Sequence, residues 1–264
     1  MKNLICKNQL LNIINRDRLP DEIIKYIENT EIYNKTFSNK SNVFYMKDKK
    51  LYIKVGCNLQ DEKINTIYFH KKGVTGEVID FIQDDFYDYL VMREIEGENG
   101  IENNYLNSPK KLAENFGKHL RMIHSIDRKD SPKKYIIENL IENAEKNVLT
   151  NNLNMKSFFY KTGFTPQKGL LMLDYLKDSY INDTFIHGDY CLPNIIMDNY
   201  KFKGIIDLDS CGIGDRHYDL CCGLWSLKYN LKTDDFGEVF LKSYGYDLID
   251  KDRLLFGKLL FILN

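Results

Sequence analysis

The residues with the clearest chemical signature form a short acidic segment in the second half of the chain. This segment, residues 187–194, reads His-Gly-Asp-Tyr-Cys-Leu-Pro-Asn, so that Asp189 and Asn194 stand five positions apart, and Asp207 follows thirteen positions later after the apolar run 204–206. A carboxylate can accept a proton from an attacking hydroxyl, and an amide oxygen with a second carboxylate can hold Mg²⁺ against nucleotide phosphates. The spacing predicts phosphoryl transfer, with Asp189 as the base and with Asn194 and Asp207 as the Mg²⁺ ligands.

Each acidic or basic residue here also has a purely structural explanation. Asp189 after Gly188 could form an ordinary turn, although the later Asn and Asp favour the catalytic interpretation. His187 is expected to brace the loop rather than to take part in catalysis. Asp219, at the head of an apolar helix, is expected to accept hydrogen bonds from the backbone of this loop, and its position near a helix N-terminus is favourable as well.

A lysine in an apolar strand supplies a second candidate site. In the strand 51–55, Lys54 and Tyr52 share one face, and the three apolar residues share the other. A lysine enclosed by an apolar strand needs a carboxylate or a phosphate, and Glu62 is the nearest candidate carboxylate. The alternative is a lysine at a sheet edge whose ammonium reaches solvent. With the acidic segment downstream, we expect Lys54 to bind phosphate.

The elements that must position these residues change in type near Gly97. Before it, alternating apolar residues and polar turns predict an antiparallel sheet that carries one helix. The predicted strands are 43–46, 51–55, 76–82 and 87–92, and the predicted helices are 10–14, 23–27 and 60–70.

After Gly97 the pattern is mainly helical. Ser108 followed by Pro109 is a typical helix start, and apolar residues then recur at helical spacing up to Ile123. Further helices are predicted at about 134–149, 166–180, 217–230, 236–243 and 250–263, interrupted by short strands at 184–186, 195–197 and 204–206. The catalytic groups are thus expected on loops that pack against helices.

Composition excludes several classes of protein. The 264 residues include 37 basic and 38 acidic side chains, a net charge of −1, without the basic excess of nucleic-acid binders. The chain shows no signal peptide and no run of about 20 apolar residues, so we expect a soluble cytoplasmic protein with no membrane partner. The six cysteines lack the paired spacing of zinc sites, and most are expected to be reduced and buried.

Taken together, these segments resemble the aminoglycoside phosphotransferases, most closely the 3'-phosphotransferase branch. The resemblance spans nearly the whole chain and rests on the Lys54 strand, residues 90–92, 124–127 and 187–194, and the stretch from Ile206 to Asp219. It implies an α+β, protein-kinase-like two-lobed fold. The implied lobes are a nucleotide-binding lobe at 1–92, a hinge at 93–97 and a catalytic, acceptor-binding lobe at 98–264.

The resemblance also implies a reaction and roles for individual residues. The family uses ATP or GTP with Mg²⁺ to phosphorylate hydroxyls of amino-sugar antibiotics. The roles carried over are the catalytic base (Asp189), the Mg²⁺ ligands (Asn194 and Asp207), the phosphate-binding lysine with its paired glutamate (Lys54 and Glu62) and backbone contacts to the nucleotide base (Arg93 and Ile95).

The chain departs from the family pattern in three places. Glu62 follows Lys54 by only eight residues, which is closer than the family places its paired glutamate. The loop 38–42 contains no glycine, so phosphates would be covered by serine and backbone donors. Acidic acceptor contacts of the family are replaced here by aromatic residues, namely Phe158, Trp225, Tyr229 and Phe261.

The aromatic replacements keep the identity of the acceptor open. They would line the acceptor site or, alternatively, belong only to the core, with Phe261 in a terminal core helix. A kinase of the same fold acting on a less cationic acceptor, such as another antibiotic, a sugar or an amino alcohol, is the main alternative. A nucleotide-binding pseudokinase and a metal-dependent phosphohydrolase are less consistent with the residues, and the segment 207–219 is too short for the activation segment of a protein kinase.

Overall fold

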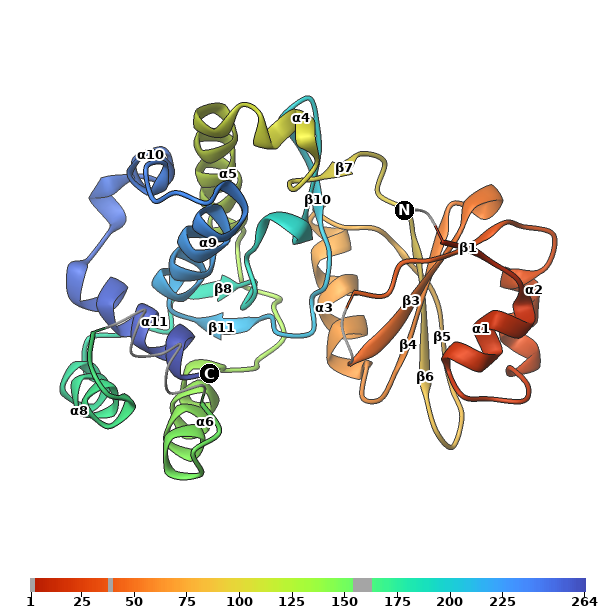
Figure 1. Cartoon of the computed structure of the whole chain (residues 1–264), viewed down its shortest axis with the longest axis horizontal. Helices are drawn as coiled ribbons and strands as arrows, with labels where there is room; N and C mark the ends of the chain where they lie inside the picture. The colour runs from red at the N-terminus through yellow and green to blue at the C-terminus, as the bar shows by residue number, and fades with distance from the viewer. Residues whose placement is uncertain (1–2, 38–39, 154–162) are drawn as a thin grey trace. The chain divides into compact units, whose positions relative to one another are not determined.

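The computed structural model describes residues 3–37, 40–153 and 163–264 (Figure 1). The chain divides into two units, Met1–Glu96 and Gly97–Asn264, and each is considered by itself. This division falls within the predicted hinge 93–97, whose role as a hinge stays a prediction.

The first unit is built on an antiparallel sheet. Its six described strands lie in the order β1-β2-β3-β4-β6-β5. Their bounds are β1 (Asn3–Ile5), β2 (Ile32–Asn34), β3 (Ser41–Met46), β4 (Leu51–Gly56), β5 (Val78–Gln83) and β6 (Asp88–Arg93). Both predicted strand pairs are present, whereas the three-residue strands β1 and β2 are too short to show an alternating pattern and were not predicted.

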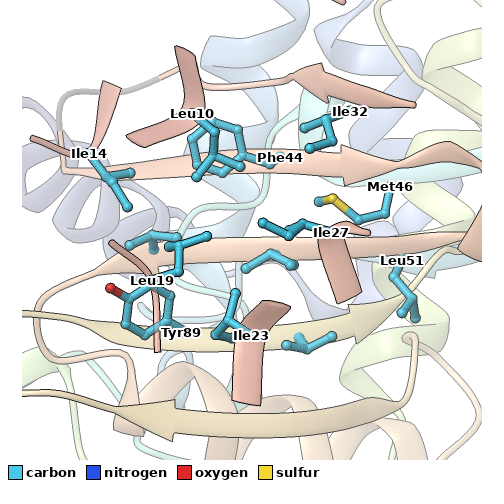
Figure 2. Close-up of a cluster of buried hydrophobic side chains, with 13 residues drawn as sticks. Leu10, Ile14, Leu19, Ile23, Ile27, Ile32, Phe44, Met46, Leu51 and Tyr89 are labelled. Atoms are coloured by element: carbon cyan, nitrogen blue, oxygen red, sulfur yellow. The ribbon is translucent and has the colours of Figure 1, made fainter. Parts of the chain in front are cut away.

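Helices cover both faces of this sheet. The short helices α1 (Lys7–Ile13) and α2 (Asp21–Ile27) supply Leu10 and Ile23 to a buried cluster against the strands (Figure 2). The apolar residues of β4 belong to this cluster, so Lys54 points to the opposite face, as predicted. Helix α3 (Gln60–Lys71) contributes a partner to Lys54 and therefore lies on that opposite face.

The second unit is mainly helical. Its described helices are α4 (Asn103–Leu106), α5 (Pro109–His124), α6 (Ile137–Leu149), α8 (Pro166–Leu176), α9 (Arg216–Leu231), α10 (Gly237–Tyr244) and α11 (Lys251–Leu263). Helix α5 begins at the predicted Pro109 and buries Leu112, Phe116 and Ile123. It packs closely on α10, because a Cβ on Gly117 would lie 2.4 Å from the carbonyl oxygen of Phe240.

Short strands interrupt these helices and carry the loops of interest. β7 (Glu98–Asn99), β9 (Ile195–Asp198) and β10 (Lys201–Ile205) form one small sheet, and β8 (Thr184–Ile186) pairs with β11 (Gly212–Gly214). The strand predicted at 204–206 begins three residues earlier in the structure, at Lys201, because β10 pairs with β9 from this residue onward through a bulge. Two short 3₁₀ turns, η1 (Lys47–Lys49) and η3 (Tyr246–Leu248), lie in loops.

The predicted α+β class, with a sheet-based first part and a helical second part, is confirmed. Within the described ranges, no helix is both long and apolar enough to span a bilayer. All six cysteines are free thiols, of which three are buried and two are exposed. The expectation that most cysteines are buried is therefore only half right.

Candidate active site

The acidic segment forms a loop between β8 and the 3₁₀ turn η2 (Leu192–Asn194). Gly188 has a φ of +78°, and a Cβ at this position would lie 2.2 Å from the carbonyl oxygen of Ser210. Only glycine adopts this conformation without strain and leaves room for the neighbouring backbone. The chain thus turns sharply after β8 and presents Asp189 on a half-buried loop.

The structure places Asp189 beside Asn194. The amide Nδ2 of Asn194 donates to the carboxylate Oδ2 of Asp189 at 3.1 Å and to its carbonyl oxygen at 3.0 Å. Burial raises the pKa of Asp189, and the charge of Asp207 raises it further, while His187 and the hydrogen bond from Asn194 lower it. The net upward shift makes this carboxylate a better proton acceptor than an ordinary aspartate.

Asp207 is held next to this pair by the β9–β10 hairpin. The N–H of Ile206 donates to the carbonyl oxygen of Asn194 at 3.0 Å, which continues the pairing of the hairpin beyond its last strand residue. Asp207 follows with a left-handed φ of 62°, and its side chain is exposed. Because water can solvate an exposed carboxylate, the charge of Asp207 alone is no argument for a metal. The case for a metal depends on the donor atoms instead.

The donor set fits Mg²⁺. Because the Nδ2 of Asn194 donates to Asp189, its Oδ1 remains as the acceptor end of the amide, and Asp207 adds carboxylate oxygens. Mg²⁺ prefers oxygen ligands and is often held by one or two protein groups, with phosphates and water completing the shell. No cluster of three or more His, Cys, Asp or Glu suited to a metal occurs in the described parts of the chain. Asn194 and Asp207 therefore suit a metal that arrives with phosphates rather than an all-protein cage.

Asp219, in the first turn of α9, anchors the backbone of the loop. Its carboxylate accepts hydrogen bonds from the N–H groups of His187 at 2.7 Å and Gly188 at 2.8 Å, and its side chain is 0% exposed. The predicted role of Asp219 is confirmed. His124 completes this anchor, with its Nε2 3.0 Å from the same carboxylate and its Nδ1 3.0 Å from the hydroxyl of Tyr244.

His187 is a bracing residue, as predicted. Its Nδ1 accepts from the N–H of Asp189 at 3.3 Å, so its Nε2 carries the proton and donates to the carbonyl oxygen of Ile206 at 3.1 Å. Both ring nitrogens are thus engaged by backbone groups that flank the two aspartates. The ring links the loop that carries Asp189 to the hairpin that carries Asp207.

Two further anchors were not predicted from the sequence. Tyr190 is fully buried, donates from its hydroxyl to the carbonyl oxygen of Phe116 at 2.8 Å and stacks on that ring at 4.4 Å between centroids. The N–H of Leu192 donates to the hydroxyl of Ser226 at 2.9 Å. The sequence does show Ser226 as a polar residue inside an apolar helix. Only the packing of α9 against the loop shows that its hydroxyl binds the backbone of Leu192.

The first unit contains the predicted lysine pair. Lys54 Nζ lies 2.7 Å from Glu62 Oε2, and the two side chains are 9% and 2% exposed. The spacing of eight residues suffices because only residues 57–59 separate β4 from α3, whose first turn carries Glu62. Tyr52 shares the sheet face of Lys54, and its ring lies 4.7 Å from that of Tyr45 across the β3–β4 pair.

Arg93 and Ile95 lie at and just after the end of β6. The N–H of Arg93 already donates to the carbonyl oxygen of Glu77 at 2.9 Å, and its guanidinium lies 3.3 Å from the carboxylate of Glu77. Only the carbonyl of Arg93 could therefore meet a nucleotide base, and the base-binding role of both residues stays a prediction. Phe158 and two residues of the glycine-free loop, Ser38 and Asn39, lie outside the described residues.

The chain is similar to known phosphotransferases over most of its length. Residues 59–256 match the model of the phosphotransferase enzyme family. A Lactococcus lactis subsp. lactis (strain IL1403) protein named "Probable aminoglycoside 3'-phosphotransferase" is 38% identical over 248 residues, which cover 91% of this chain and 93% of that protein. An aminoglycoside 3'-phosphotransferase of Niallia circulans is 25% identical, with 89% of this chain and 93% of the relative covered.

The fold is likewise similar to that of a solved structure. The crystal structure of an aminoglycoside-3'-phosphotransferase of type VIII superposes with a TM-score of 0.74 at 18% sequence identity, and 97% of this chain and 98% of that chain are covered. The likeness extends over both units and confirms the kinase-like fold predicted from the sequence.

Proposed function

Because the chain belongs to the phosphotransferase enzyme family, we propose that it transfers the γ-phosphate of ATP or GTP to a hydroxyl of an aminoglycoside antibiotic. The observation that carries the proposal is the half-buried Asp189 carboxylate, hydrogen-bonded to Asn194, near Asp207 and anchored through Asp219. The choice of an aminoglycoside as the acceptor is based on the names of the relatives given above. With nucleotide triphosphate as its co-substrate, the protein is expected to work in the cytoplasm as a resistance enzyme.

In this proposal Asp189 positions the acceptor hydroxyl and accepts its proton as the oxygen attacks phosphorus. The raised pKa of Asp189 strengthens it as a base, and the bond from Asn194 fixes its orientation. Phosphoryl transfer requires little covalent chemistry from the protein, so correct positioning of these groups supplies most of the rate enhancement.

The remaining predicted residues would bind the nucleotide. Asn194 and Asp207 would hold Mg²⁺, which when bound supplies positive charge to the phosphate oxygens. Lys54, fixed by Glu62, would donate to phosphate oxygens. The carbonyl of Arg93 and the backbone of Ile95 would contact the nucleotide base.

A kinase of the same fold that acts on a less cationic acceptor is the second candidate. One observation favours it: Trp225 and Tyr229 are 40% and 58% exposed, so these aromatic replacements are surface residues rather than core. A pseudokinase that only binds nucleotide would lack turnover with every acceptor.

Nucleotide turnover by the purified protein tests the proposal. The assay would use Mg²⁺ with ATP or GTP and would compare kanamycin, neomycin, neutral sugars and amino alcohols as acceptors. The expected result is turnover that depends on an aminoglycoside and that falls by at least 10³-fold in Asp189→Ala. Turnover with none of the aminoglycosides would overturn the proposed acceptor, and free phosphate released without regard to acceptor would indicate a phosphohydrolase.

A further inference from the structure

A buried tyrosine at the end of α10 is connected to the catalytic loop through two side chains. Tyr244 is the last residue of α10 and is 1% exposed. Its hydroxyl lies 3.0 Å from Nδ1 of His124, and Nε2 of that ring lies 3.0 Å from the carboxylate of Asp219. This carboxylate also accepts the two backbone N–H groups that directly precede Asp189. We call Tyr244, His124 and Asp219 the anchor relay. It crosses the helices α10, α5 and α9, which pack on one another (Figure 1).

The outer member of the relay is fixed in place by its neighbours. Nη1 of Arg121 donates to the carbonyl oxygen of Tyr244 at 3.2 Å. A Cβ on Gly245, whose φ is +124°, would lie 2.7 Å from the same Nη1, so glycine permits this close approach. The rings of Tyr244 and His124 meet edge to face, with centroids 5.7 Å apart and planes at 80°. The hydroxyl of Tyr244 therefore has a fixed direction toward His124.

The partners of His124 determine which of its ring nitrogens carries the proton. A carboxylate only accepts hydrogen bonds, so Nε2 must be the protonated nitrogen that donates to Asp219. Nδ1 of the neutral ring is then an acceptor, and the hydroxyl of Tyr244 donates to it. Burial raises the pKa of Tyr244 to about 12, so this hydroxyl keeps the proton that it donates. All donors in the relay thus point from Tyr244 toward the catalytic loop.

We propose that Tyr244 is a positioning residue for the catalytic base: its hydroxyl orients the His124 ring, and the ring orients Asp219 and the loop backbone before Asp189. The effect on turnover rests on the proposed function, whereas the relay itself does not depend on the acceptor. Removal of the hydroxyl leaves Nδ1 of His124 buried without its donor, so the ring reorients and its bond to Asp219 weakens. Because a general base acts only in accurate geometry, the resulting displacement lowers kcat and leaves substrate binding intact.

Steady-state kinetics of Tyr244→Phe test this role, because the variant keeps the ring and removes only the hydroxyl. We expect kcat to fall about tenfold, with the KM values of nucleotide and acceptor within about twofold of the wild type. Tyr105→Phe is the matched control. Tyr105 is also 1% exposed, and its hydroxyl donates to the carbonyl oxygen of Met197 at 3.1 Å, so this variant loses a similar buried bond outside the relay. Its kcat should stay within about twofold of the wild type.

Amide hydrogen exchange measures the relay without turnover. The backbone N–H groups of His187 and Gly188 are the donors to Asp219, so their exchange rates report on the end of the relay nearest the base. In Tyr244→Phe these two amides should exchange at least about tenfold faster, whereas amides in the middle of α11 should keep their rates. A loss of global stability would instead accelerate exchange in both places. Tyr105→Phe should leave the two loop amides as they are in the wild type.

A double variant tests whether the effect passes through His124. In His124→Gln, the side-chain amide can donate to Asp219 without the help of Tyr244. Adding Tyr244→Phe to this variant should therefore lower kcat by less than about twofold further. Multiplication of the two separate effects would show that Tyr244 acts by another route and would overturn the inference.

The outcomes distinguish this inference from the proposed function. If Tyr244→Phe matched Tyr105→Phe in kcat or in the exchange of the loop amides, the inference would be wrong and the function would stand. If no aminoglycoside supported turnover, the proposed function would fail, and faster exchange of the loop amides alone would support the relay. Should Tyr244→Phe not fold, the ¹⁵N chemical shifts of His124 in the wild type decide. A protonated Nε2 with a hydrogen-bonded, unprotonated Nδ1 supports the relay, and a protonated Nδ1 overturns it.

Discussion

Replacing Asp219 with asparagine tests the anchor of the catalytic loop. The carboxylate is 0% exposed and accepts three hydrogen bonds, from the N–H groups of His187 and Gly188 and from the ring of His124. An asparagine of the same shape has only one acceptor oxygen, so its amide nitrogen would face one of the backbone donors. The loss of a charge-assisted bond costs about 1.5–3 kcal/mol, and a buried N–H left unsatisfied costs about 1–3 kcal/mol. We therefore expect Asp219→Asn to lower the free energy of unfolding by about 3–5 kcal/mol.

The same substitution should impair catalysis in the molecules that remain folded. Because Asp219 holds the backbone directly before Asp189, its loss shifts the base, and a shift of about 1 Å can lower kcat by about 10²-fold. Urea unfolding would measure stability, and turnover in folded protein would measure kcat. Asp174→Asn is the control, because Asp174 forms a surface pair with Lys177 and is 72% exposed, so its removal should change stability by less than about 0.5 kcal/mol. If Asp219→Asn matched this control in both assays, the anchoring argument would be refuted.

Three further predictions follow from the same structure. Gly188→Ala should reduce kcat by more than about 10²-fold, because the added Cβ would meet the carbonyl oxygen of Ser210. Circular dichroism would show whether the variant keeps its fold, and an undiminished kcat would contradict the close approach of the two segments. Burial lowers the pKa of His119 to about 4. As the pH falls below about 6.5, this histidine therefore takes up a proton in the unfolded chain before it does so in the folded protein. Stability should fall by about 2 kcal/mol between pH 7 and pH 5, and urea unfolding of His119→Gln should show a smaller fall. Glu62→Gln should raise the nucleotide KM about tenfold, because Lys54 loses the carboxylate 2.7 Å away, and an unchanged KM would remove the pair from nucleotide binding.

Local sequence patterns were sufficient where neighbours in the chain decide the structure. The start of α5 at Pro109 and the face of β4 that carries Lys54 depend on residues within one or two turns or on strand alternation. The very short strands β1, β2 and β11 were not predictable. Each has three residues, and its pairing with a distant strand, rather than its own composition, makes it a strand.

The loop anchors show the same division at the site itself. Asp189, Asn194 and Asp207 could be selected by spacing, because phosphoryl transfer needs those groups in that order along one loop and hairpin. His124 and Ser226 could not be assigned as anchors of the loop from the sequence, since their partners stand 95 and 34 residues away in the chain. Distance in sequence hides such pairs until the helices α5 and α9 pack beside the loop.

The sequence by itself therefore determined the reaction class and the α+β division of the chain, and it selected Asp189, Asn194 and Asp207 as the predicted base and metal ligands. Local spacing, strand alternation and helix starts encode these features. Only the tertiary structure decided which groups hold the loop in place and that Trp225 and Tyr229 lie on the surface rather than in the core. These features depend on which helix faces pack together. Burial and long-range hydrogen bonding arise from that packing and cannot be assigned from residue order alone.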